Sequence, residues 1–270
     1  MEGVVMAVVN ISTPAGVTLH VSDEGEGPAV LFVHGIACDG TDWLAQTARF
    51  RHSHRVIVVD LRGHGRSSVP DSGYDLRTFA DDLVTVLDDR GVGSCIVVGH
   101  SLGALISAEF AITHPDRVRA VIAIDPPWGP PSARELFATL APVVAEPGGL
   151  AAVFEASDSP LTPGHFREAH RRGALVTDPA VLRQAWDECF IVPSSLAFDE
   201  ARLRTRQCPL FVLHSKTPGL IEWEREMSVH PADRAIELPV GHWIHHDLPD
   251  LVNEMIQEWT DGLTADAQIA

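Results

Sequence analysis

The segment from residue 96 to residue 113 constrains the fold more than any other part of the chain. The apolar run IVV is followed by GHSLG, residues 99–103, and then by a stretch that is apolar nearly all round. A G-x-S-x-G pattern between a buried strand and a buried helix predicts a sharp turn that raises the hydroxyl of Ser101 above the sheet. Gly99 and Gly103 suit this turn, because a Cβ at either position would collide with neighbouring backbone. The flanking strand and helix disfavour the alternative, an ordinary turn with an incidental serine, and make Ser101 the candidate nucleophile.

Apolar runs and helix-like stretches alternate along much of the remaining sequence. Strands buried on both faces are predicted at residues 29–33, 56–59, 95–98, 118–124 and 210–213, a short one at 236–239, and a half-buried one at 17–22. Helical spacing is found at residues 74–90, 102–113 and 249–263. This alternation predicts an α/β fold, with a mostly parallel sheet flanked by helices.

The alternation breaks between Pro126 and Leu203. This stretch has helical fragments, many prolines and no strong strand candidate. At about 80 residues it is too long for a simple loop. We therefore expect residues 127–203 to form an inserted helical cap, and residues 1–126 and 204–270 to form the core domain.

Two backbone N–H groups are candidates for an oxyanion hole beside Ser101. Leu102 begins the helix after the serine, where its N–H can stabilise negative charge. The predicted strand 29–33 ends in His34 and Gly35, so the N–H of Ile36, or that of Gly35, would supply the second donor. An ordinary glycine turn is the alternative interpretation of this loop.

A serine needs an adjacent base, and the chain has fourteen histidines. In proteins with a G-x-S-x-G serine turn of this kind, the chain order is serine, acid, histidine, which places the base after the last strand. There His242 directly follows a glycine and is the preferred candidate, with His245 and His246 as alternatives. His242 and His245 could also be a metal pair, but no ligand motif accompanies them, so we expect no metal.

The acid is predicted at the end of a strand. The strand at 210–213 leads into HSKTP, which contains no carboxylate, and Glu222 lies further on. Asp125 follows the strand at 118–124, from where it could accept the Nδ1 proton of His242. We favour Asp125 over Glu222, although Asp125 could instead cap the turn before Pro126.

Together these residues resemble the α/β-hydrolase superfamily, and DLRGHGRS (residues 60–67) is similar to its structural D-x-R-G-x-G-x-S loop. A narrower similarity links ISTPAGVT (11–18), TP (217–218), AW (185–186) and PSS (193–195) to the zearalenone lactonases. That resemblance implies an acid at Asp125, where the group has Glu, and contact of Trp186 with a bound lactone. His34, His100 and Leu102 depart from the group's pattern.

Several aromatic residues fall within the predicted cap or at its entrance. Trp128, Phe154, Trp186 and Phe190 indicate an apolar substrate pocket, or else the cap's own core. His34 completes the candidate substrate contacts.

We expect a cofactor-free serine hydrolase that cleaves an ester or lactone of an apolar substrate through an acyl-enzyme. Rival hypotheses are a carbon–carbon bond hydrolase or lyase with the same triad, a perhydrolase, and a ligand receptor on this fold. Serine as nucleophile argues against haloalkane dehalogenases and epoxide hydrolases, which use Asp.

The bulk composition limits the partners and the compartment. A net charge of −17 argues against nucleic acid and anionic membranes. The sequence has no apolar run of about 18 residues and no convincing signal peptide. Four widely spaced cysteines indicate free thiols, so we expect a cytoplasmic protein and leave a homodimer open.

Overall fold

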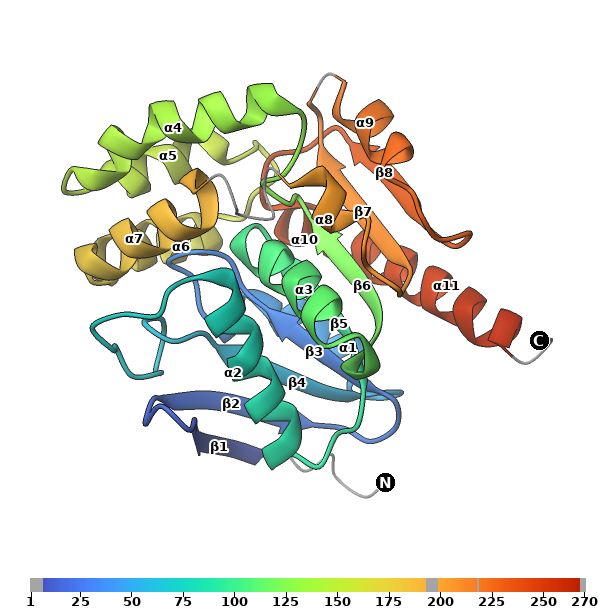
Figure 1. Cartoon of the computed structure of the whole chain (residues 1–270). Helices are drawn as coiled ribbons and strands as arrows, with labels where there is room; N and C mark the ends of the chain where they lie inside the picture. The colour runs from blue at the N-terminus through green and yellow to red at the C-terminus, as the bar shows by residue number, and fades with distance from the viewer. Residues whose placement is uncertain (1–6, 193–198, 218, 268–270) are drawn as a thin grey trace.

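A single eight-stranded sheet organises the chain (Figure 1). The computed structural model describes residues 7–192, 199–217 and 219–267. The strand order is β1-β2-β4-β3-β5-β6-β7-β8. The strands are β1 (Ala7–Ser12), β2 (Thr18–Glu24), β3 (Ala29–Val33), β4 (Arg55–Asp60), β5 (Cys95–His100), β6 (Val118–Ile124), β7 (Leu210–Ser215) and β8 (Arg234–Leu238). The pairings β1–β2 and β2–β4 are antiparallel and the other five are parallel, which confirms the predicted mostly parallel sheet.

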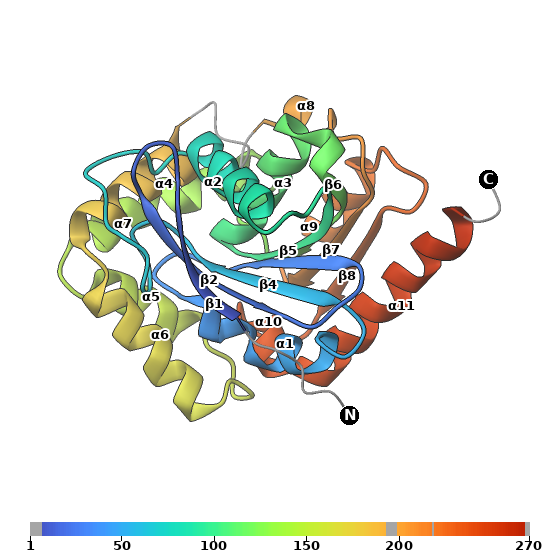
Figure 2. The same ribbon diagram turned by 90° about the horizontal axis from the view of Figure 1, so that it is seen from below.

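Helices cover both faces of this sheet (Figures 1 and 2). One face carries α2 (Leu76–Asp89) and α3 (Leu102–Thr113), and the other carries α1 (Leu44–Phe50), α10 (Ile244–Asp247) and α11 (Pro249–Ala267). Along β3, Leu31 and Val33 pack into the core on the first face, whereas Val30 and Phe32 pack into the core on the second. This double burial explains why the central strands are continuous apolar runs.

Short elements complete the connections of the core. The 3₁₀ turn η1 (Gly40–Trp43) precedes α1, η2 (Pro115–Arg117) links α3 to β6, and α9 (Leu220–Glu226) links β7 to β8. The loop after β4 is held by Asp60, whose carboxylate accepts hydrogen bonds from the N–H groups of Gly40 (2.8 Å) and Arg66 (2.9 Å). These bonds agree with a structural role for the loop at residues 60–67.

The segment between β6 and β7 consists of helices joined by loops, with no strand among its described residues. Its helices are α4 (Pro131–Ala145), α5 (Gly149–Ser157), α6 (Gly164–Val176), α7 (Pro179–Trp186), the π-helical turn η3 (Asp187–Ile191) and α8 (Glu200–Leu203). Figures 1 and 2 show α4 to α7 grouped beyond one end of the strands. This is where a cap would lie, and the division at residues 127 and 203 stays a prediction. The PSS segment falls outside the described residues.

Strand β1 and helix α1 were not predicted from the sequence. In β1, apolar residues occupy both faces of an edge strand, and Val8 is half exposed, so the alternation that reveals a half-buried strand is lost. Helix α1 has only seven residues, too few for a clear helical period.

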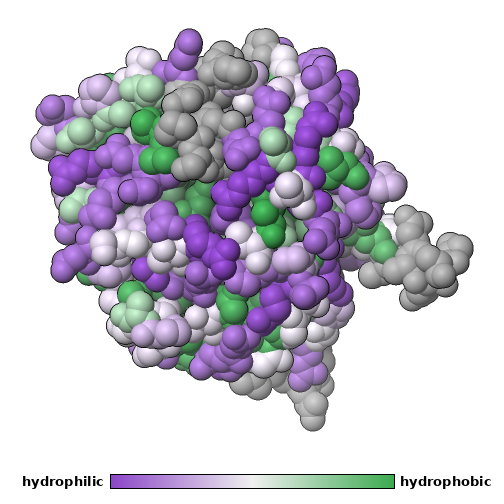
Figure 3. Space-filling model, in the orientation of Figure 1, coloured by the Kyte–Doolittle hydropathy of each residue, from purple (hydrophilic) through white to green (hydrophobic). Residues whose placement is uncertain are grey.

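The molecular face drawn in Figure 3 is mainly hydrophilic, in agreement with the high net charge of the chain, and its hydrophobic residues lie in small separate patches. None of the helices in the described ranges is long and apolar enough to cross a bilayer. All four cysteines are buried, and no disulfide joins any of them.

Candidate active site

Ser101 lies on the turn between β5 and α3, in a backbone conformation that is rare for a residue with a side chain. Its φ and ψ are 52° and −119°, a strained combination for a residue with a Cβ. A Cβ on Gly99 would lie 2.1 Å from the carbonyl oxygen of Gly103, and a Cβ on Gly103 would lie 2.1 Å from that of Val33. Both glycines are therefore required for the close packing of β3, β5 and α3 that supports the turn.

His242 follows β8 and contacts Asp125 at the end of β6. The Nδ1–H of His242 donates a hydrogen bond of 2.6 Å to Oδ2 of Asp125. The carboxylate also accepts bonds from the N–H (2.7 Å) and the hydroxyl (3.0 Å) of Ser215 at the end of β7. Glu222, the alternative acid, is exposed on α9. The neighbouring strands β6 and β7 thus orient Asp125 toward the histidine.

A second buried pair extends this arrangement away from the serine. His214 lies with Nδ1 3.7 Å from Oδ1 of Asp125, and its Nε2–H donates a 2.8 Å hydrogen bond to Glu224. Glu224 also accepts a hydrogen bond from the indole N–H of Trp128. The groups Asp125, His214, Glu224 and Trp128 form what we call the buried relay.

The contacts within the buried relay determine the protonation states of His214 and Asp125. Burial alone would lower the pKa of His214, but the flanking carboxylates of Asp125 and Glu224 outweigh it and raise that pKa to about 9. Burial likewise opposes ionisation of Asp125, yet its interactions with His214 and His242 hold its pKa below the ordinary value. The imidazolium of His214 therefore keeps Asp125 ionised.

Sequence reasoning missed both His214 and Glu224. His214 belongs to the strand end HSKTP, which attracted notice only because it lacks a carboxylate, and Glu224 was not singled out beside Glu222. Both side chains are nearly fully buried, at 1% and 5% exposure. No short motif marks them; only the packing of α9 on β7 brings them together.

The loop after β3 lies beside the serine, as the oxyanion-hole hypothesis requires. A Cβ on Gly35 would lie 3.4 Å from Cβ of Ser101, and Ile36 lines the same cavity as the serine. Leu102 is the first residue of α3, and an N–H at that position has no acceptor within its own helix. The roles of Ile36, Gly35 and Leu102 as donors stay predictions.

His34, a candidate substrate contact, lies outside the cavity walls. This residue is fully buried and is not among the residues that line the cavity. Its Nδ1–H donates to the carbonyl of Gly35 (2.7 Å), and its Nε2 accepts from the N–H of Leu61 (3.0 Å). Burial also lowers its pKa, which favours the neutral ring that this bonding needs. His34 therefore fixes the loop, and a contact of its side chain with substrate stays an untested prediction that this burial disfavours.

The neighbouring histidines are buried behind His242. His245 and His246 do not line the cavity, whereas His242 does. His100, beside the serine, has its Nε2 3.0 Å from the carbonyl oxygen of His242, and the two rings lie 4.5 Å apart. His100 thereby supports the backbone that carries His242.

A cavity of about 410 Å³ opens above Ser101, Asp125 and His242. Its other walls are mostly apolar and include all four aromatic residues named from the sequence, Trp128, Phe154, Trp186 and Phe190. The indole N–H of Trp186 donates to the carbonyl of Phe137 (3.3 Å), and that of Trp128 to Glu224. Because both polar atoms are already bonded within the protein, the two rings offer apolar surface to the cavity.

Comparisons with known proteins agree with this architecture. The model of the alpha/beta hydrolase family matches residues 30–255. The 2-(acetamidomethylene)succinate hydrolase of Mesorhizobium japonicum is 41% identical over 109 residues, 40% of this chain and 39% of that protein. An epoxide hydrolase of Caballeronia sordidicola is 38% identical over 116 residues, 42% of this chain and 35% of that protein. In both relatives the match therefore spans less than half of the protein.

A solved structure matches nearly the whole chain. The thermophilic esterase from Thermogutta terrifontis superposes with a TM-score of 0.78 and 26% identity, covering 95% of this chain and 99% of the esterase. The two relatives and this esterase are named as hydrolases of different kinds, and the esterase shares the arrangement of sheet and helices found here.

Proposed function

The chain belongs to the alpha/beta hydrolase family, and from this premise we propose that it is a serine hydrolase that cleaves a carboxylic ester or lactone through an acyl-enzyme. The observation that carries the proposal is the 2.6 Å hydrogen bond from His242 to Asp125, at the floor of the cavity that Ser101 also lines. A histidine held by a carboxylate in this way presents its Nε2 as a base.

The reaction takes place in two steps. His242 removes the proton of Ser101 while Oγ attacks the substrate carbonyl, and the N–H groups of Ile36 and Leu102 stabilise the oxyanion. His242 then gives the proton to the departing alcohol oxygen, which leaves an ester on Ser101. Water, deprotonated by His242, attacks this ester, releases the carboxylic acid and restores the serine hydroxyl. Asp125 stabilises the imidazolium in both steps.

The cavity favours a neutral, apolar substrate. None of the described residues that line it is Lys or Arg, so a substrate carboxylate would find no cationic partner on these walls. A macrolactone of the zearalenone type fits such walls, as does an ester with a bulky aryl or alkyl group.

A serine in this position disfavours epoxide hydrolysis, despite the epoxide hydrolase among the relatives. Attack of a serine hydroxyl on an epoxide would leave an ether, which has no carbonyl for water to attack. Attack on an ester leaves another ester, which His242 can help water to hydrolyse.

The test combines covalent labelling with turnover. The protein is treated with a fluorophosphonate and assayed by mass spectrometry on a panel of aryl esters, small lactones and macrolactones. We expect one label on Ser101, hydrolysis of at least one ester or lactone, and loss of roughly six orders of magnitude in kcat for Ser101→Ala. Ser72→Ala, a change at an exposed serine, should leave both results unchanged. Full turnover by Ser101→Ala, or products of carbon–carbon cleavage alone, would overturn the proposal.

A further inference from the structure

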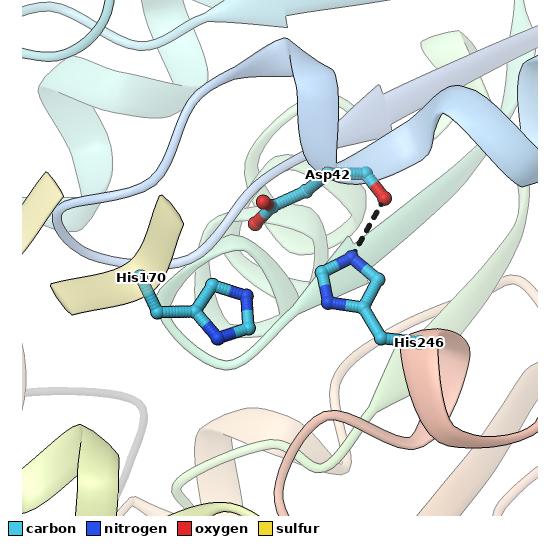
Figure 4. A group of neighbouring side chains, drawn as sticks. All are labelled: Asp42, His170 and His246. Atoms are coloured by element: carbon cyan, nitrogen blue, oxygen red, sulfur yellow. Dashed lines mark hydrogen bonds between the residues drawn. The ribbon is translucent and has the colours of Figure 1, made fainter. Parts of the chain in front are cut away.

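Three buried ligand-type side chains that do not line the active-site cavity meet in the interior of the protein. Asp42 comes from η1, His170 from α6 and His246 from α10, so the cluster joins the core to the helical segment between β6 and β7. One potential ligand atom from each side chain lies within 4.8 Å of those of the other two. Figure 4 shows the Asp42 carboxylate and the two imidazole rings around one space.

The polar atoms of this cluster have few partners. Oδ2 of Asp42, both ring nitrogens of His170 and Nδ1 of His246 have no hydrogen-bond partner in the part of the chain that the structure describes. The three side chains are only 2–4% exposed: 4% for Asp42, 2% for His170 and 3% for His246. Buried polar atoms are rarely left in this state, because each loses its bonds to water without replacing them.

A hydrogen bond of His246 fixes the orientation of its ring and leaves one ring nitrogen able to bind a metal ion. Its Nε2–H donates to the backbone carbonyl of Asp42 at 2.9 Å, which leaves the lone pair on Nδ1 (Figure 4). A ring fixed in this way by a backbone carbonyl is typical of metal-binding histidines. Burial lowers the pKa of His246 to about 4 and that of His170 to about 2, so both rings are neutral near pH 7.

Aromatic stacking does not explain the unpartnered atoms. The ring of His170 stacks on Trp243 at 3.5 Å and 16°, and that of His246 stacks on Phe166 at 3.8 Å and 7°. Stacking occupies the ring faces, whereas the nitrogen lone pairs lie in the ring planes at the edges. The stacks therefore hold the two rings nearly parallel, at 11° to each other, without satisfying their nitrogens.

A second cavity connects the cluster with the surface. It measures about 440 Å³, and its walls include Asp42 and His170 as well as Arg66 and Val176, which is 73% exposed. It shares no lining residue with the cavity above Ser101. An ion from solvent can therefore reach Asp42 and His170 without passing the catalytic residues.

We propose that Asp42, His170 and His246 bind a divalent transition-metal ion of the Zn²⁺ class. Two imidazole nitrogens and one carboxylate oxygen suit Zn²⁺ or Co²⁺, with water as a fourth ligand. Tetrahedral ligands at about 2.1 Å from Zn²⁺ lie about 3.4 Å apart, so the three ligand atoms, all within 4.8 Å of one another, must approach by at most roughly 1.4 Å. The ion links α6 to η1 and α10 and stabilises the packing of the helical segment on the core. This departs from the expectation of no metal, which was drawn from the His242–His245 pair.

The test measures binding directly and needs no substrate. Protein freed of metal with a chelator is titrated with Zn²⁺ by calorimetry, and the Co²⁺ form is examined by visible spectroscopy. We expect one site per chain with a Kd below about 10 µM, a tetrahedral Co²⁺ spectrum, and a Tm raised by about 5 °C at a hundredfold excess of Zn²⁺ over Kd.

Matched variants identify the ligands. His170→Gln and Asp42→Asn should weaken Zn²⁺ binding at least tenfold, and His170→Phe should do the same while it keeps the stack on Trp243. His165→Gln, at an exposed histidine of the same helix, should bind like the original protein. Absence of binding at 1 mM Zn²⁺, or equal binding by the His170→Phe and His165→Gln variants, would overturn the proposal. Neither outcome bears on the function proposed for Ser101.

Discussion

Glu224 should control how the stability of this protein changes with pH. Its carboxylate is buried and accepts hydrogen bonds from His214 at 2.8 Å and from the indole N–H of Trp128. The change Glu224→Gln keeps the size of the side chain and an oxygen acceptor, but it removes the negative charge. His214 is then left with Asp125 alone, and the cost of burying an imidazolium lowers its pKa.

The size of the effect follows from the pKa of His214, which is about 9 in the folded protein against an ordinary value of 6.5. Between these values the folded state binds one more proton than the unfolded state, so the free energy of unfolding falls as pH rises. The contribution of His214 is complete below pH 6.5 and lost above pH 9. It is worth about 2.5 kcal/mol at pH 7 and about 1 kcal/mol at pH 8.5.

Urea unfolding at pH 7, 7.5, 8 and 8.5 measures this difference. The original protein should lose about 1.5 kcal/mol across the range, and Glu224→Gln should lose less than half of that. Glu222→Gln, two residues away on the same helix but exposed, controls for the removal of a charge from α9. If Glu224→Gln and Glu222→Gln show the same pH dependence, His214 does not carry the charge that the structure assigns to it.

Two further changes test the site and its support. Asp125→Asn should lower kcat in ester assays by about 10⁴-fold, because the amide cannot stabilise the imidazolium and favours the wrong tautomer of His242. Glu222→Gln should retain full activity in the same assays. Full activity of Asp125→Asn together with loss of activity in Glu222→Gln would make Glu222 the acid. Gly103→Ala should cost about 3 kcal/mol or more in urea unfolding, since its Cβ would lie 2.1 Å from the carbonyl oxygen of Val33. Gly93→Ala, with no atom within 4 Å of the new Cβ, should change stability by less than about 0.5 kcal/mol, and equal losses would contradict the packing argument.

The sequence by itself determined most strands of the sheet and the serine turn. Strands buried on both faces must be continuous apolar runs, so β3 and β6 were located at their observed bounds, residues 29–33 and 118–124. The glycines around Ser101 are a local requirement of the turn, and a local requirement is visible in a short motif. Edge strand β1 was missed because its solvent-exposed face does not require polar residues, so the alternation that predicts a half-buried strand is absent.

Only the tertiary structure decided which polar side chains act together. Asp125 and His242 are 117 residues apart in the chain, and two carboxylates could have reached that histidine by sequence alone. The pairing of His214 with Glu224, the loop-fixing role of His34 and the meeting of Asp42 with two histidines left no pattern in the sequence. Their charges, bonds and accessibility depend on burial and on distances between segments, which are set when the helices close over the ends of the strands.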